Sequence, residues 1–387
     1  MAGTGHGPHG PLTGVRVVEL AGIGPAPFAA MLLADLGADV VRVDRPGGPG
    51  LGVEPRYDIT NRNKRSVLVD LKTEAGREAV LQLAARADVF LEGYRPGVAE
   101  RLGVGPEDAL ARNPRLVYGR MTGWGQDGPL AATAGHDIGY IAVTGALGLT
   151  GPPDGPPYAP ANLLGDYAGG SLYLVVGVLA ALHHARAAGT GQVVDAAIVD
   201  GTAHLTAMLH AMTAAGGWQD RRGANLLDGG APFYGTYETA DGEYMAVGAL
   251  ETRFHAEFAR LLGIEDVEGV ADARSDTARW GELRAAIAAR FRQRTRAEWT
   301  EVFAGTDACV APVLSLREAP RHPHLAARGT FAAPGGITQP APAPRFSATP
   351  GTLRRPPAQP GADAAEVARD WGLPGLRQLQ KGPHDEA

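Results

Sequence analysis

An alternation of short apolar strands with helices is the feature that most constrains this fold. Residues 15–20 (VRVVEL) form a β-branched, apolar run, and residues 28–36 (FAAMLLADL) show a helical pattern that ends at Gly37. A second apolar run follows at 39–43 (DVVRV), which predicts a strand–helix–strand unit. Such an alternation is typical of a parallel sheet with helices on both faces.

The same alternation continues far along the chain. A helix is predicted from about Glu74 to Arg86 behind a Thr73 cap, and the apolar segment 171–182 (SLYLVVGVLAAL) predicts a buried helix. Further strands are predicted at SVLVDL, DVFLE, RLVYGRM and QVVDAAIV. We therefore predict the α/β class, with an open, parallel, Rossmann-like sheet in a large domain.

The character of the sequence changes near residue 216, where a glycine-rich polar stretch begins. Beyond it, the pattern predicts a smaller α+β domain, and residues 332–362 are rich in proline, alanine and glycine. We predict four parts: a flexible N-terminal tail (1–11), a large α/β domain (12–215), a small α+β domain with its linker (216–330), and a Pro-rich connector with a C-terminal helix that returns to the large domain (331–387).

The charge pattern argues against nucleic acid as a partner. The 387 residues have a net charge of −6 and contain no long basic run. The one local cluster of cations, NRNKRS, is a candidate phosphate contact through Arg62, Lys64 and Arg65, although a solvated loop is the more common outcome for such a run. The single cysteine, Cys309, excludes an internal disulfide, and its apolar context (DACVAPVL) predicts a buried thiol.

The sequence predicts no membrane association. The longest apolar stretch, 171–182, is shorter than the roughly 18 residues that a membrane span needs. The chain opens on MAGTGHGPHGP, which lacks the apolar core of a signal peptide. We therefore expect a cytoplasmic protein with no membrane partner.

The first strand–helix–strand unit invites comparison with a dinucleotide-binding motif. Gly22 and Gly24 follow the strand, and Asp44 comes about twenty residues later. Pro27 stands where the third glycine belongs, however, and Pro25 and Pro27 remove two N–H donors that would hold a pyrophosphate. The motif therefore disfavours a nicotinamide cofactor.

Two other common chemistries lack their motifs. None of the five serines lies in a G-x-S-x-G turn, which argues against a serine hydrolase. The chain contains no H-E-x-x-H and no C-x-x-C, so we expect no bound metal.

Two ionisable groups stand directly behind glycines in apolar surroundings. His136 and Asp137 occur in AGHDIGY, and Asp166 occurs in NLLGDYAGG. Taken alone, each residue has an equally good structural explanation: His136 could be a capping or core histidine, and Asp166 could be a helix N-cap. Taken together, two groups that can exchange protons near neutral pH favour acid–base chemistry.

The motifs in which these residues occur resemble a known family. They are PLTGVRVVELAGIGPAPFAAMLLADLGADVVRVDRPG, LEGYRPGV, GRMTGWGQDGP, AGHDIGY, NLLGDYAGG, GQVVDAA, ANLLDGGAPFY, AVGALE and DACVAPVL. Their order from about residue 11 to 350 resembles that of the 2-methylacyl-CoA racemases, which have the type III coenzyme A transferase architecture. The resemblance implies a large and a small domain and two interlocked, ring-like chains that form a homodimer.

The resemblance also implies a reaction and its catalytic residues. Racemases of this family move the α-proton of an acyl-CoA thioester from one face of the carbon to the other, which matters for branched-chain lipids. His136 and Asp166 match the two acid–base groups, the backbone N–H of Asp137 matches the donor to the enolate oxygen, and Glu251 in AVGALE matches a carboxylate near the histidine. Coenzyme A is part of the substrate, so no separate cofactor is expected.

Further positions match the family's contacts to the coenzyme A thioester. They are Arg45, which matches a phosphate contact, Val69, Asp70, Leu71 and Lys72 along the nucleotide, Arg95, and Gly135, Ile138, Gly139 and Tyr140 around the thioester. Ala161 departs from the family, where leucine is usual before Asn-Leu, and this leaves the acyl chain open.

Two alternative functions stay open at this point. A type III coenzyme A transferase would use Asp166 as a nucleophile, but such relatives generally lack the histidine of AGHD. A non-catalytic acyl-CoA-binding protein would not require the acid–base pair, which is intact here.

Overall fold

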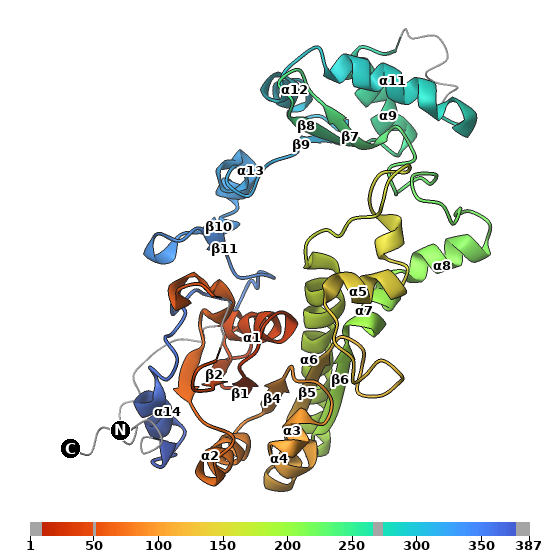
Figure 1. Cartoon of the computed structure of the whole chain (residues 1–387). Helices are drawn as coiled ribbons and strands as arrows, with labels where there is room; N and C mark the ends of the chain where they lie inside the picture. Colours follow the sequence, from red (N-terminus) through yellow and green to blue (C-terminus); the bar gives the residue numbers. More distant parts are fainter. Residues whose placement is uncertain (1–9, 49–51, 266–273, 377–387) are drawn as a thin grey trace. The chain divides into compact units, whose positions relative to one another are not determined.

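The chain folds into two compact units, each with its own hydrophobic core. The computed structural model describes residues 10–48, 52–265 and 274–376, so most of the predicted N-terminal tail lies outside the described residues. The first unit consists of Met1–Thr144, Pro160–Leu205 and His324–Ala387, and the second of Gly145–Ala159 and Thr206–Pro323. Figure 1 labels the elements of both units.

A six-stranded parallel sheet forms the centre of the first unit. Its strands are β1 (Arg16–Leu20), β2 (Asp39–Asp44), β3 (Arg65–Leu68), β4 (Val89–Glu92), β5 (Val117–Thr122) and β6 (Gln192–Ala197). They lie in the order β3-β2-β1-β4-β5-β6, and every neighbouring pair is parallel. The predicted α/β class is confirmed. The strand order reverses between β1 and β4, and ligands of open sheets commonly bind at such a point.

Helices cover both faces of this sheet (Figure 1). They include α1 (Pro25–Asp35), α2 (Glu74–Ala84), α3 (Val98–Arg101), α4 (Pro106–Arg112), α6 (Leu172–Ala188) and α14 (Ala364–Asp370). Leu33 of α1 and Val178 of α6 belong to the core on one face, while Leu83 of α2 and Val367 of α14 belong to the core on the other. Thr73 caps α2 as predicted, because its hydroxyl accepts the N–H of Gly76 at 3.0 Å.

The apolar helix is longer than the sequence predicts. A π-helical segment, η4 (Leu163–Ser171), runs directly into α6. The combined helix has 26 residues and is long and apolar enough to cross a membrane, so the argument from length no longer holds. Its inner side chains, including Leu174 and Val178, are instead buried in the core beside β5 and β6. The helix α7 (Ile198–Leu205) packs against η4.

A three-stranded antiparallel sheet forms the centre of the second unit. Its strands are β7 (Tyr234–Glu238), β8 (Tyr244–Gly248) and β9 (Val310–Pro312), and its helices include α8 (Ala207–Ala214), α9 (Thr252–Leu262), α11 (Trp280–Phe291) and α12 (Arg296–Phe303). Phe258, Phe291 and Trp299 are buried between the sheet and the helices. This arrangement agrees with the predicted α+β fold.

The boundaries between the units differ from the predicted ones in three places. Residues 324–330 belong to the first unit, although the sequence placed them in the small domain. Residues 145–159 belong to the second unit, although the sequence placed them in the large domain. Arg222 explains this attachment, because its guanidinium donates to three backbone carbonyls of that segment. Residues 206–215, which contain α8, also belong to the second unit.

The cation run NRNKRS is buried and paired, which corrects both interpretations made from the sequence. Each of its three cations has a carboxylate partner: Arg62 pairs with Asp35, Lys64 with Glu19 and Arg65 with Asp39. Arg62 also donates to the carbonyl of Pro340, and Arg65 pairs with Asp370, so the run holds the C-terminal segment on the first unit. It is therefore neither a phosphate contact nor a solvated loop.

Cys309 is exposed, which contradicts the predicted buried thiol. It directly precedes β9, an edge strand of the small sheet. Val310 packs against the core, whereas Cys309 has a φ of 54° just before the strand and leaves its side chain exposed.

Candidate active site

His136 lies at the start of a short helix, α5 (Asp137–Val143). Its backbone is extended, with φ −137° and ψ 167°, and its carbonyl accepts the N–H of Gly139 at 2.8 Å. The imidazole is exposed and makes no capping hydrogen bond, so it is neither a cap nor a core histidine. The helix begins with Asp137, and the first N–H groups of a helix have no intrahelical acceptor.

Asp166 lies inside η4 and not at a helix N-cap, because the π-helical turns begin at Leu163. Its backbone N–H donates to Oδ1 of Asp137 at 2.7 Å, and its Oδ2 accepts a hydrogen bond from Nδ2 of Asn162 at 3.3 Å. The two predicted acid–base positions thus belong to separate elements that are joined through Asp137.

The carboxyl group of Asp166 has a raised pKa. Burial is the largest cause, because it disfavours the charged form. The hydrogen bond from Asn162 lowers this pKa, the negative charge of Asp137 raises it, and His136 lowers it. His136 is therefore close enough to act electrostatically on Asp166. A carboxyl with a raised pKa is better suited to exchange a proton near neutral pH.

The glycines of the site permit close contacts between its own groups. A Cβ at Gly165 would lie 2.4 Å from Oδ1 of Asp137, and a Cβ at Gly135 would lie 2.5 Å from the ring of Tyr140. At Gly24, where φ is 83°, a Cβ would lie 3.4 Å from Oδ2 of Asp166. Any larger residue before Asp166 would therefore push Asp137 away from it.

Tyr140 connects α5 with the turn after β5. Its ring packs edge-on against Trp124, with 4.8 Å between the ring centroids. Burial and then the charge of Asp166 raise the pKa of Tyr140, while the guanidinium of Arg95 lowers it. Tyr140 therefore lies within electrostatic range of both Asp166 and Arg95. Ile138, by contrast, is 54% exposed.

Arg45 is exposed directly after β2. Burial raises the pKa of Tyr94, which lies in the turn after β4, and the positive charge of Arg45 lowers it. The carboxyl ends of parallel strands share one edge of a sheet, so Arg45 and Arg95 lie at the same edge as the turn that contains Gly24.

Residues 69–72 follow β3 at this edge. Asp70 and Lys72 are exposed, and Oδ1 of Asp70 accepts the N–H of Lys72 at 2.9 Å. The side chains of Val69 and Leu71 are part of the hydrophobic core. At those two positions only the backbone is left to face a nucleotide.

Glu251 belongs to the second unit, where it is the N-cap residue of α9. Its side chain is exposed and makes no capping hydrogen bond. Its charge acts on Cys309, whose pKa is raised first by the loss of part of its hydration and then by Glu251. The role of Glu251 beside the histidine stays a prediction.

Three residues near the predicted site were not singled out from the sequence: Tyr94, Trp124 and Asn162. The spacing of four residues between Asn162 and Asp166 was a usable signal, since such pairs share one face of a helix. It was missed because the helix was predicted to begin after Asp166. No group of three His, Cys, Asp or Glu side chains suited to a metal occurs within 10–48, 52–265 and 274–376.

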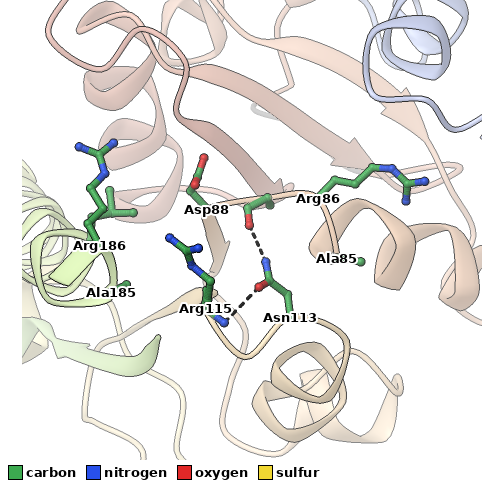
Figure 2. A pocket seen from close by; sticks show the side chains of 9 residues that line it. Ala85, Arg86, Asp88, Asn113, Arg115, Ala185 and Arg186 are labelled. Atoms are coloured by element: carbon green, nitrogen blue, oxygen red, sulfur yellow. Dashed lines mark hydrogen bonds between the residues drawn. The ribbon is translucent and has the colours of Figure 1, made fainter. Parts of the chain in front are cut away.

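A small crevice of about 220 Å³ lies at the opposite edge of the sheet (Figure 2). Asp88 and Arg115, which line it, precede β4 and β5, and Arg186 reaches it from the end of α6. Asn113 donates to the carbonyl of Ala87 at 2.8 Å and so ties the loops beneath the crevice together. It contains none of the predicted site residues.

The chain belongs to the CoA-transferase family III, whose model matches residues 12–364. It is 45% identical to the alpha-methylacyl-CoA racemase of Mus musculus over 94% of this chain and 93% of that protein. It is 44% identical to the alpha-methylacyl-CoA racemase of Homo sapiens over 94% of each chain. The succinyl-CoA:glutarate CoA-transferase of Homo sapiens is less similar, with 29% identity over 93% of this chain and 86% of that protein.

Solved structures of the same family support the fold. A CAIB/BAIF family protein from Brucella suis has a TM-score of 0.81 and 30% identity, and the match covers 94% of this chain and all of that one. The protein Rv3272 of Mycobacterium tuberculosis has a TM-score of 0.78 and 29% identity, with 93% and 99% covered. The predicted type III coenzyme A transferase fold is confirmed.

Proposed function

We propose that this protein is a 2-methylacyl-CoA racemase, an isomerase that inverts the α-carbon of 2-methyl-branched acyl-CoA thioesters in lipid metabolism. The observation that carries the proposal is the arrangement of His136 and Asp166. These two groups come from separate elements and are linked through Asp137, and His136 acts electrostatically on Asp166. The similarity to the mouse and human racemases supports the same activity.

Inversion of a carbon by proton transfer requires a base on one face and an acid on the other. In the proposed reaction, the imidazole of His136 takes the α-proton of the S thioester. The electron pair of the C–H bond moves toward the thioester oxygen and gives an enolate. The protonated carboxyl of Asp166 then returns a proton to the opposite face, and the reverse reaction exchanges the two roles.

The enolate oxygen needs a donor aimed at its developing charge. The backbone N–H of Asp137 suits this role, because it is the first N–H of α5 and helix N-termini favour negative charge. Gly135, Ile138, Gly139 and Tyr140 surround the same turn and would contact the thioester. Glu251 is proposed as a further carboxylate that orients the imidazole of His136 or favours its protonated form.

Coenzyme A is part of the substrate, so we propose no separate cofactor. Arg45 would bind one of its phosphates, since it is exposed beside Tyr94 at the carboxyl edge of the sheet. The backbone and exposed side chains of residues 69–72 would follow the nucleotide, and Arg95 would lie closer to the thioester. All of these positions follow strands of one parallel sheet.

The active form is proposed to be an interlocked homodimer in the cytoplasm. Large apolar side chains on α5 and α6 support a partner surface, because Val143 is 64% and Val176 is 66% exposed in the single chain. Sedimentation at micromolar concentration should give the mass of a dimer, and a monomer mass would contradict it.

A type III coenzyme A transferase is the second candidate. The transferases among the relatives support it, because a carboxylate at Asp166 would serve as a nucleophile. His136 favours the racemase, since a nucleophilic carboxylate needs no second base across the substrate carbon. The two activities differ in whether a second carboxylic acid is required.

Deuterium exchange separates the two activities. The purified protein, given a 2-methylacyl-CoA in heavy water without any other carboxylic acid, should incorporate deuterium at the α-carbon. A transferase would show no reaction until an acceptor acid is added, and it would then transfer coenzyme A to that acid. Absence of exchange together with acid-dependent transfer would overturn the racemase proposal.

Single variants then test the two bases. Either His136→Ala or Asp166→Ala should slow net inversion by about 100- to 10,000-fold, the range for loss of one general base. His136→Ala should still exchange the R substrate, and Asp166→Ala the S substrate. Equal loss of exchange from both enantiomers in both variants, with the fold retained, would contradict the two-base mechanism.

A further inference from the structure

The side chain of Asp137 has a structural position that its proposed backbone role does not explain. It is 7% exposed, and its Oδ1 accepts the backbone N–H of Asp166 at 2.7 Å. Its Oδ2 is buried and has no hydrogen-bond partner among the described residues. Gly165 makes the contact possible, because a Cβ there would collide with Oδ1 at 2.4 Å.

A half-satisfied buried carboxylate is unfavourable for stability, and its removal in favour of an apolar side chain is often tolerated. The single hydrogen bond to Asp166 offsets only part of this unfavourable term. Asp137 thus resembles groups that are kept for function at some expense of stability. The nature of that function follows from what surrounds Asp166.

The charged groups that act on the Asp166 carboxyl come from one helix. They are Asp137 of α5 and His136 at its N-cap. Tyr140 of the same helix is in electrostatic range of Asp166 and of Arg95 after β4. The helices α1, α6 and α7 also pack on η4, but they add no further charge that acts on this carboxyl. Asp137 is therefore the one negative charge that acts on Asp166 within the described part of the chain.

We propose that the Asp137 carboxylate is a positioning residue for Asp166: it fixes the main chain of Asp166 against α5 and keeps a second negative charge beside the base. This inference rests on the proposed racemase function and extends it. The hydrogen bond sets where the carboxyl of Asp166 stands relative to His136. The like charge favours the protonated form of Asp166 and makes it the stronger base once it is ionised.

Two substitutions separate the geometric effect from the electrostatic one. Asp137→Asn keeps an oxygen that can accept the Asp166 N–H but removes the charge, whereas Asp137→Ala removes both. Both variants keep the backbone N–H of residue 137. Asp220→Asn serves as the matched control, because Asp220 is exposed in a loop of the second unit and has no proposed role in the reaction.

The measurement is deuterium exchange from each enantiomer across pH. In Asp137→Asn, the acidic limb of kcat/KM for the R substrate should move to lower pH by about half a unit or more, because a neighbouring negative charge has been removed. Exchange from the S substrate should change less. A carbon-13 titration of the Asp166 carboxyl should show the same downward movement without reference to turnover.

Asp137→Ala should lower R exchange by about 10- to 100-fold, since a small misplacement of a catalytic group has an effect of that order. A purely structural role would weaken both enantiomers equally and leave the acidic limb in place, and that result would overturn the inference. So would an Asp137→Asn protein that matches Asp220→Asn at every pH. If the parent protein exchanges neither enantiomer, the racemase proposal itself fails, and the carbon-13 titration still decides whether Asp137 acts on Asp166.

Discussion

Two regions of the first unit contain buried charged groups in opposite arrangements. In the cation run, Nζ of Lys64 lies 2.7 Å from Oε2 of Glu19, and both side chains are fully buried. In the candidate active site, two carboxylates, Asp137 and Asp166, lie together, and one oxygen of Asp137 has no partner among the described residues. The first region neutralises its charges, while the second keeps like charges close together.

This difference indicates what each region is for. A buried charge next to an opposite charge is tolerated because the pair offsets much of its lost hydration, and it then fixes the chain locally. Buried like charges weaken the folded state but move pKa values toward those useful for proton transfer. Substitutions in the cation run should therefore reduce stability, and substitutions in the site should reduce activity without that loss.

The largest effect on stability is expected for Lys64→Met. The substitution leaves Glu19 buried without its cation, and breaking a buried pair in this way typically destabilises a protein by about 3–5 kcal/mol. Burial lowers the pKa of the Lys64 ammonium, but its hydrogen bond to the Pro27 carbonyl at 2.9 Å and its pairing with Glu19 favour the charged form. Equilibrium unfolding in urea measures the change.

The double variant Lys64→Met, Glu19→Leu provides the control. Because it removes both charges and leaves apolar groups of similar volume, it should recover most of the lost free energy of unfolding. If the double variant is as unstable as Lys64→Met, the damage comes from altered packing and not from an unpaired charge. The comparison between the two regions would then lose its physical basis.

The opposite sign is expected for Asp166→Asn. Folding raises the pKa of Asp166, chiefly through burial, so the folded state holds the proton more tightly than the unfolded state. Its contribution to stability is complete below the unfolded pKa and is lost as pH rises through the folded pKa. Near neutral pH, Asp166→Asn should therefore make the protein slightly more stable than the parent while it slows two-base inversion by about 100- to 10,000-fold.

Thermal denaturation across pH tests this sign. The gain from Asp166→Asn should be clear at neutral pH, should shrink as pH falls through the raised folded pKa of Asp166, and should be gone below the pKa of an unfolded aspartate. Asp220→Asn should show no such dependence. A variant that is less stable than the parent at neutral pH would mean that Asp166 supports the fold in the same way as Lys64.

Much of the fold could be predicted from local pattern. The strand–helix alternation predicted the parallel sheet, and Thr73 predicted its cap, because both depend on residues close in sequence. The pairing of His136 with Asp166 was also within reach, since each stands behind a glycine. The structure adds the reason at Gly165, where only glycine lets Asp137 approach.

Other features depend on partners that are distant in sequence. Arg62 binds the carbonyl of Pro340, 278 residues further along, and no local pattern reveals such a contact. The prediction that Asp166 lies at a helix N-cap was wrong. The π-helical turns have no distinctive sequence pattern, and because of them the helix begins at Leu163. Residues 145–159 join the second unit through Arg222, which again lies far away in sequence.

The smallest effect is expected for an ion pair on the surface, Glu78 with Arg112. Its geometry is bidentate, with Nη2–Oε2 at 2.7 Å and Nη1–Oε1 at 3.1 Å, yet the two side chains are 42% and 45% exposed. The hydrogen bonds from Arg112 and then Gln82 lower the pKa of Glu78, so its contribution is present above the unfolded pKa and is lost as pH falls through the folded pKa.

Water solvates both groups of this exposed pair in the unfolded and the folded state, and dissolved salt screens their attraction. Glu78→Gln should therefore lower the free energy of unfolding by only about 0.2–1 kcal/mol, and by less in 1 M salt. Urea unfolding at low and high salt, beside Lys64→Met, measures this. A loss as large as that of Lys64→Met would mean that pairing geometry, and not burial, makes a charge structural, and the contrast between the cation run and the active site would have to be drawn from geometry instead.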